Sequence, residues 1–271
     1  MTLIQGLLTR DNILLEWLLL FSAGFFGGAL NAIAGGGSFI TFPALLLAGI
    51  PPISANATNT FASCSGYLSG AYALRGELKP HRKELLPILS ISLVGGLLGA
   101  WLLLTTPENL FRKAIPWLLL FATLLFIFGG DIHRRLKTFS ARHRHASTLG
   151  RWLTRLLLLG VALYGGFFNA GLGIIILSYL ALSGHVQINA MNGLKLLISS
   201  AVSLIAIALF IHQEVIAWQQ GLAVLLGTFA GGYASARLSQ RLPEVYVRNF
   251  AILIGVGTTL YFFLTIYWTE S

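Results

Sequence analysis

The 271-residue chain is 56% hydrophobic and only 10% charged, with a mean hydropathy of +0.78. A soluble domain carries about 25% charged side chains, so this composition excludes an ordinary soluble enzyme. The net charge of +9 comes from basic residues in short loops between apolar runs, where they indicate membrane orientation rather than nucleic-acid binding. Cys64, the single cysteine, excludes an internal disulfide and any metal site built from thiolates.

Apolar segments long enough to cross about 30 Å of hydrocarbon recur along the chain. They predict an all-α integral membrane protein with eight full transmembrane helices, near residues 14–34, 55–74, 85–104, 113–130, 153–170, 189–211, 215–235 and 247–267. Two further apolar stretches, 38–49 and 172–183, are only about a dozen residues long, which is typical of half-helices or re-entrant segments. Each of the two follows a glycine cluster.

The distribution of basic residues predicts the orientation of these helices. Most of the 18 Lys and Arg residues lie in the regions 75–84, 131–155 and 236–248, which we therefore expect in the cytoplasm. An even number of crossings between these regions requires the short stretch 172–183 to cross as well, and by symmetry 38–49. We expect about ten passes with both termini outside, although a tightly folded re-entrant pair could mimic a crossing.

An internal repeat relates the two halves of the sequence. Residues 27–32 (GGALNA) are similar to residues 165–170 (GGFFNA), and each block is followed by a glycine cluster, a short apolar run and a turn glycine. Farther on, residues 56–59 (NATN) are similar to residues 189–192 (NAMN). The recurrence of both blocks in the same order predicts a duplication.

The repeat predicts one membrane domain in three parts. Residues 1–135 form the first transmembrane repeat, 136–152 a basic cytoplasmic linker, and 153–271 the second repeat. If each repeat makes an odd number of passes, the two must be inverted with respect to each other in the membrane. Inverted repeats are frequent in secondary transporters, whose substrate lies near the midplane where broken helices meet.

The glycine clusters and nearby polar residues are the candidate substrate site. Glycine lets the backbone leave helical geometry, and the polar groups freed by a break must then face protein or a water-filled cavity. The exposed N–H groups at the start of a half-helix favour an anion. The alternative is that the glycines only allow close helix packing and the asparagines bridge helices. The candidates are Asn31, Gly35, Gly36, Gly37, Ser38, Asn59, Asn169, Gly171, Gly173 and Asn192.

Lys195 completes the candidate site. All nine acidic residues fall at helix ends or in loops, which argues against a carboxylate proton relay or an acidic cation site. Lys195 lies inside a predicted helix, where a lysine costs about 2.5–3.5 kcal/mol. It either faces an anionic substrate or extends to the nearby interface. His185, just beyond Gly184, is a weaker candidate and is more typical of a turn or interface residue.

Two stretches resemble the TauE/SafE family of sulfite and organosulfonate exporters. The first is Ile33–Leu45 (IAGGGSFITFPAL), continued by Ala57-Thr58-Asn59, and the second comprises Gly166-Phe167-Phe168 and Lys195-Leu196-Leu197. The resemblance extends over nearly the whole chain. It implies a membrane transporter with two related halves that moves small sulfur-containing anions. Residues 169–173 (NAGLG) depart from the fuller Gly/Pro-rich turn that is common in the family.

We therefore predict a multi-pass transporter of the bacterial inner membrane that moves a small anion, such as sulfite or a sulfonate, by alternating access. Its expected partners are that anion and membrane lipids, not nucleic acid, and homo-oligomerisation is left open. We expect no catalytic residues, metal or cofactor, since the sequence has no nucleotide-binding loop and no hydrolase motif. The alternatives are an intramembrane enzyme and a structural subunit of a membrane complex.

Overall fold

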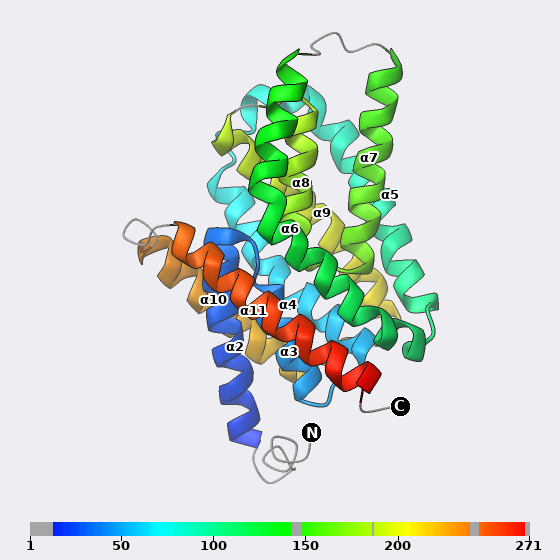
Figure 1. Cartoon of the computed structure of the whole chain (residues 1–271), viewed down its shortest axis with the longest axis vertical. Coiled ribbons are helices and arrows are strands. Elements are labelled where there is room, and N and C mark those ends of the chain that lie inside the picture. Colours follow the sequence, from blue (N-terminus) through cyan, green and yellow to red (C-terminus); the bar gives the residue numbers. More distant parts are fainter. Residues whose placement is uncertain (1–12, 143–147, 186, 239–243, 269–271) are drawn as a thin grey trace.

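The computed structural model describes residues 13–142, 148–185, 187–238 and 244–268 (Figure 1). Helices joined by short turns make up this part of the chain, which contains no strand. Its α-helices are α2 (Ile13–Ala34), α3 (Ser38–Leu47), α4 (Pro52–Ala73), α5 (Arg82–Thr105), α6 (Glu108–Arg142), α7 (Thr148–Phe167), α8 (Leu172–Leu182), α9 (Ile188–His212), α10 (Trp218–Leu238) and α11 (Glu244–Phe263). A short 3₁₀ helix, η2 (Lys79–His81), precedes α5, and a π-helical turn, η3 (Leu264–Trp268), ends the described chain.

The predicted order of elements is present: a long helix, a short one and three long ones, repeated once. Five of the described helical stretches are both long and apolar enough to cross a membrane, namely Ile13–Asn31, Lys79–Thr105, Glu108–Gly129, Ile188–His212 and Asn249–Trp268. α4 is less apolar because it carries a run of polar residues, and these are buried inside the protein. The expected helices 113–130 and 153–170 are parts of α6 and α7, which extend over most of the linker 136–152.

The outer surface is as apolar as the composition predicts. Leu14 is 80% exposed, Leu86 75% and Leu253 70%, and many other large apolar side chains on the long helices are also exposed. Soluble monomers rarely expose contiguous apolar surface on this scale. In contrast, Asn56, Asn59 and Asn169 are at most 2% exposed. The protein is thus apolar outside and partly polar inside, as a multi-pass membrane protein is.

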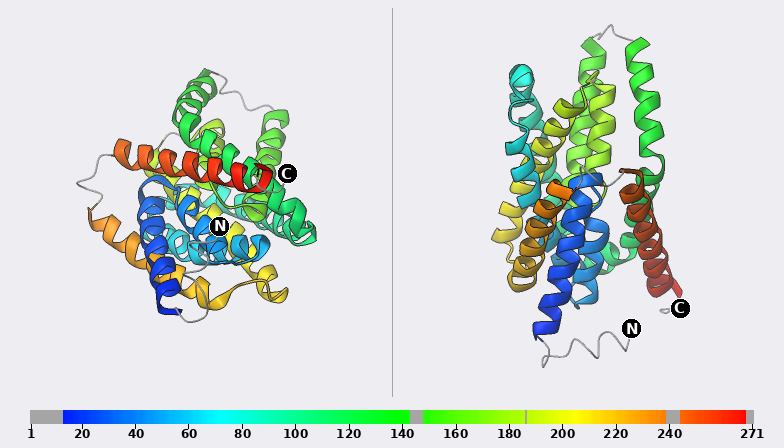
Figure 2. Two further views of the ribbon diagram at one scale, coloured as in Figure 1. Left: turned by 60° about the horizontal axis from the view of Figure 1, so that its bottom comes forward. Right: turned by 90° about the vertical axis from the view of Figure 1, so that its left-hand side faces the viewer.

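The two short helices fold back along the helices that precede them. The reversals occur at Gly35 (φ +78°) and Gly171 (φ +76°), in the left-handed region that glycine adopts without strain. α3 returns along α2, as the contact of Thr41 in α3 with Gly27 in α2 shows. α8 returns along α7 and ends at the side of the protein where α7 begins (Figures 1 and 2). In each half the left-handed glycine turns the chain back, so the short helix and the helix before it form a hairpin, which corresponds to the re-entrant alternative that the sequence left open.

Two pairs of long helices pack unusually closely, and they correspond between the halves. α2 lies along α10, and α7 lies along α5. A Cβ atom added to Gly231 of α10 would lie 1.8 Å from the carbonyl oxygen of Phe25 in α2. A Cβ atom added to Gly99 of α5 would lie 2.0 Å from the carbonyl oxygen of Leu163 in α7. Small residues at these positions allow the helix backbones to touch, which is how helices associate in membranes.

The helices connect two ends of the bundle. The 74–82 and 183–187 turns lie at the end where α7 begins, towards the top of Figure 1. The 48–51, 106–107 and 213–217 turns lie at the opposite end, where α2 begins. α2 and α7 therefore enter the protein from opposite ends, and the two helix breaks lie between those ends.

Candidate functional site

The two helix breaks lie close together inside the protein. The first, at residues 35–37, separates α2 from α3, and the second, at 168–171, separates α7 from α8. α6 touches both, since a Cβ atom on Gly36 would lie 2.7 Å from the ring of Phe126, and one on Gly171 would lie 3.2 Å from Cβ of Ala122. Ala122 and Phe126 are about one helical turn apart. The ring of Phe42, in α3, also packs edge-on against Phe168, with ring centroids 5.4 Å apart.

Asn59 of α4 binds the start of α3 at the first break. Its Nδ2 donates a hydrogen bond to Oγ of Ser38 at 3.1 Å, and its Oδ1 accepts one from the Thr41 hydroxyl. The Thr41 hydroxyl also contacts the carbonyl oxygen of Gly37 at 3.1 Å. Asn59, Ser38 and Thr41 are all buried, with exposures of 1%, 6% and 2%. Two of the candidate residues, Ser38 and Asn59, are therefore bonded to each other at the first break.

Asn169 performs the corresponding role at the second break. Its Oδ1 accepts a hydrogen bond from the Tyr67 hydroxyl of α4 at 3.1 Å, and its Nδ2 donates one to Oγ of Ser203 in α9 at 3.4 Å. The Tyr164 hydroxyl donates to the carbonyl oxygen of Ala170 at 2.7 Å. These bonds satisfy polar groups that the break exposes in an apolar interior, where an unpaired group is costly.

Asn56 connects α4 directly with the end of α7. Its Nδ2 donates to the carbonyl oxygen of Phe167 at 2.9 Å. Its Oδ1 is buried and has no hydrogen-bond partner in the described part of the chain. α4 therefore contacts both breaks through Asn56, Asn59 and Tyr67. Among its polar atoms beside the breaks, Asn56 Oδ1 accepts no hydrogen bond in the described part of the chain.

Lys195, a half-buried residue of α9, packs against the first turn of α8. Its Cδ atom is 3.5 Å from the position of a Cβ atom on Gly173. The lysine stem thus packs along the glycine just inside the α8 N-terminus. That terminus carries a partial positive charge, and the N–H groups of Leu172, Ile174 and Ile175 bond to the carbonyl oxygens of Asn169 and Gly171 at the break. A lysine and a helix N-terminus at one place both attract an anion.

The remaining predicted residues have more local roles. Asn31, half-buried in the last turn of α2, accepts a hydrogen bond through its carbonyl oxygen from N–H of Gly35 at 3.1 Å. A Cβ atom on Gly37 would lie 2.8 Å from Cβ of Asn31, so Gly37 is packed against the helix that it follows. A Cβ atom on Gly35 would have nothing within 4 Å. Asn192 is half-buried about one turn before Lys195 on α9.

Sequence reasoning missed several partners at the breaks. Thr41, Tyr67 and Ser203 bond to predicted residues and Tyr164 to the backbone of Ala170. A lone Tyr, Ser or Thr in a transmembrane segment gives no specific signal. Asn56 was visible, because it begins the 56–59 block of the repeat. The described acidic side chains lie near the ends of the bundle, away from both breaks: Glu16, Glu77, Glu84, Glu108 and Glu214.

Comparison of the sequence with models of protein families shows the family to which the chain belongs. The model described as "Sulfite exporter TauE/SafE" matches residues 20–262, which include both breaks and Lys195. The chain belongs to the TauE/SafE family. The match covers both halves, so membership applies to the whole membrane domain.

Curated relatives of this TauE/SafE protein are named as transporters. A "Probable membrane transporter protein ORF9" of a Sinorhizobium species is 29% identical over 89% of this chain and 90% of its own. A "Probable membrane transporter protein" of Haemophilus influenzae is 29% identical, covering 89% and 92%. The "Probable membrane transporter protein YfcA" of Escherichia coli K12 is 28% identical, covering 87% and 85%. No solved structure gives a significant match. The protein is therefore a membrane transporter of the TauE/SafE family and not an enzyme.

Proposed function

We propose that this protein is a secondary transporter that binds a small anion between its two helix breaks and moves it by alternating access. The observation that carries the proposal is the packing of Lys195 along Gly173, at the N-terminus of α8. In this proposal the Lys195 ammonium supplies the positive charge, and the residues around the two breaks supply hydrogen-bond donors.

The electrostatics of the breaks support an anion. The Lys195 side chain lies beside the partial positive charge of the α8 N-terminus. Both favour a negatively charged ligand at this place. The described carboxylates lie near the ends of the bundle, so the breaks favour an anion over a cation.

The arrangement of the helices supports alternating access between inverted halves, 1–135 and 153–271. Each half consists of a hairpin with a broken helix followed by three long helices. The hairpins start from opposite ends of the bundle (Figure 2), and the α2–α10 contact corresponds to the α7–α5 contact. An odd number of crossings after each hairpin makes the halves inverted, as in many secondary transporters. The basic 75–84 region marks its end of the bundle as cytoplasmic in an inner membrane.

The family description supports a sulfur-containing anion, because it names sulfite. Sulfite and organosulfonates both present three oxygen acceptors on one sulfur atom. In this proposal the Lys195 ammonium and the Ser38 hydroxyl, one beside each break, donate hydrogen bonds to these oxygens.

The test is a flux screen with the full chain in proteoliposomes. Sulfite, thiosulfate and two organosulfonates are compared with sulfate, phosphate and chloride, and with an organic cation of similar size. We expect saturable flux of at least one sulfur oxyanion or sulfonate above that of protein-free vesicles. Flux of the cation without flux of any anion would contradict the proposal.

A further inference from the structure

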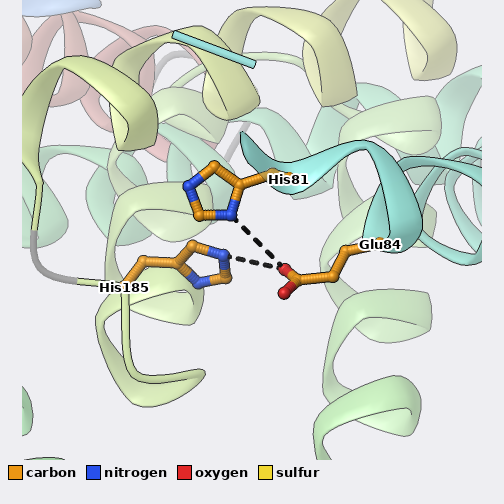
Figure 3. Close-up of side chains that lie close together, drawn as sticks. All are labelled: His81, Glu84 and His185. Atoms are coloured by element: carbon orange, nitrogen blue, oxygen red, sulfur yellow. Dashed lines mark hydrogen bonds and ion pairs between the residues drawn. The ribbon is translucent and has the colours of Figure 1, made fainter. Parts of the chain in front are cut away.

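Three potential metal ligands meet at the end of the bundle opposite the described chain termini. Figure 3 shows His81, Glu84 and His185 pointing toward one another. The distance from His185 Nε2 to Glu84 Oε2 is 3.2 Å, and that from His81 Nδ1 to the same oxygen is 3.7 Å. One ligand atom from each residue lies within 4.8 Å of the other two. The two imidazole rings are 5.1 Å apart.

The three residues come from both halves of the protein. His81 ends η2, Glu84 lies in the first turn of α5, and His185 follows α8. The side chains of His81 and His185 are 22% and 11% exposed, whereas that of Glu84 is 55% exposed. The cluster is thus sheltered on one side and open to water at the carboxylate, so an ion can reach it.

The geometry points to a divalent transition metal site, and we propose that His81, Glu84 and His185 bind an ion such as Zn²⁺. With metal–ligand bonds of about 2.0–2.1 Å, neighbouring ligand atoms in a tetrahedral site lie roughly 3.3 Å apart. The contacts at 3.2 and 3.7 Å are close to that spacing, and the ligand nitrogens of His81 and His185 lie within 4.8 Å of each other, so rotation of the imidazoles toward one another completes the site. Two imidazoles and one carboxylate with water in the fourth position form a known zinc ligand set.

The kinds of ligand in the cluster favour some metal ions over others. Ca²⁺ and Mg²⁺ depend on several oxygen ligands, whereas the cluster offers one carboxylate. Imidazole ligands instead suit Zn²⁺, Cu²⁺ and Ni²⁺.

An ion at this cluster has a structural consequence for the second break. It ties the end of α8, and hence the α7–α8 hairpin, to the start of α5 in the first half. If the hairpin moves against α5 during transport, the bound ion slows flux. This effect on flux rests on the proposed function, whereas binding of the ion is independent of it. Binding and flux are therefore measured separately.

The binding experiment uses purified full-length protein in detergent, without an affinity tag, and Zn²⁺ as the probe. A second preparation carries H133A, H143A and H145A, which remove the histidines of the basic 131–155 region. We expect one Zn²⁺ per chain in both preparations. Because loss of even an outer-shell partner lowers metal affinity 10- to 100-fold, His185→Ala and Glu84→Gln should each weaken binding by roughly 100-fold or more. His212→Ala, at the opposite end of α9, is the matched control and should bind as the parent does.

Two results would overturn the site. One is the absence of saturable Zn²⁺ binding in the parent protein, which does not depend on how any variant folds. The other is full retention of binding after His81 and His185 are both replaced by alanine in a protein that elutes as a single species. The visible spectrum of bound Co²⁺ adds a readout of geometry, which a tetrahedral site predicts and surface adsorption does not. Zn²⁺ binding without an effect on flux would refute only the regulatory consequence.

Discussion

The hydrogen bond between Asn59 and Ser38 should couple α4 energetically to the first helix break. Asn59→Ala removes the bond from Nδ2 to the Ser38 hydroxyl and the bond from Thr41 to Oδ1. Ser38→Ala removes only the first of these. Thr41 retains its contact with the Gly37 carbonyl in either variant. The two substitutions should therefore not be additive.

The expected magnitude follows from hydrogen bonds measured between membrane helices, which average about 0.6 kcal/mol and reach roughly 1.7 kcal/mol. Asn59→Ala breaks two such bonds and should lower the free energy of unfolding by about 1–3 kcal/mol. The coupling energy between Asn59→Ala and Ser38→Ala should be about 0.6–1.7 kcal/mol. Since Asn59 and Ser38 are almost fully buried, water cannot replace the lost partner.

The assay is a double-mutant cycle measured by reversible unfolding in mixed detergent micelles, followed by circular dichroism. Ser92→Ala is the matched control, because the Ser92 hydroxyl is also buried but bonds only to the Ile88 carbonyl in its own helix. It should be additive with Asn59→Ala within about 0.3–0.5 kcal/mol. If the coupling energy between Asn59→Ala and Ser38→Ala is no larger than this control value, the hydrogen bond does not stabilise the break.

Two further predictions concern the second break and the orientation of the bundle. Gly171→Ala should lower the free energy of unfolding by about 1–2 kcal/mol, because alanine is strained at φ +76°. Gly160→Ala, in a helix with open space around its Cβ position, is the control and should be neutral or stabilising. Equal effects of the two substitutions in a thermal unfolding assay would contradict this explanation of the hairpin. In intact cells, a cysteine introduced as Gln213→Cys should react with an impermeant thiol reagent from outside, whereas Gly76→Cys should react only after permeabilisation. The reverse pattern would invert the proposed topology.

Much of the architecture could be predicted because membrane insertion constrains the sequence strongly. Apolar runs had to be long enough to cross hydrocarbon, and the polar residues within them had to face inward. The helices are interrupted at 35–37 and at 168–171, beside the two glycine clusters, although Gly173 itself lies within α8, and Ser38 and Asn59 bond to each other at the first interruption. Whether the short stretches cross or return could not be decided from loop charges, because a hairpin and a double crossing leave the next loop on the same side.

The contacts between distant segments could not be predicted in the same way. Tyr67 reaches Asn169 across 102 positions, and His185 reaches Glu84 across 101. A lone tyrosine in a helix or a histidine in a turn has no periodicity that identifies its partner. The extension of α6 as far as Arg142 was also missed, because a basic amphipathic continuation of a transmembrane helix resembles a solvated loop when only hydropathy is considered.

The most direct test of the proposed anion site is the binding and flux of a transported anion in Lys195 variants. Lys195→Ala should weaken anion affinity by roughly 10- to 100-fold, since a hydrogen bond to a charged group contributes about 1.5–3 kcal/mol. Lys195→Arg, which keeps the charge, should retain a larger share of the parent's affinity. If Lys195→Ala folds as the parent does and binds and transports the anion with unchanged constants, the anion does not lie beside Lys195 and the α8 N-terminus.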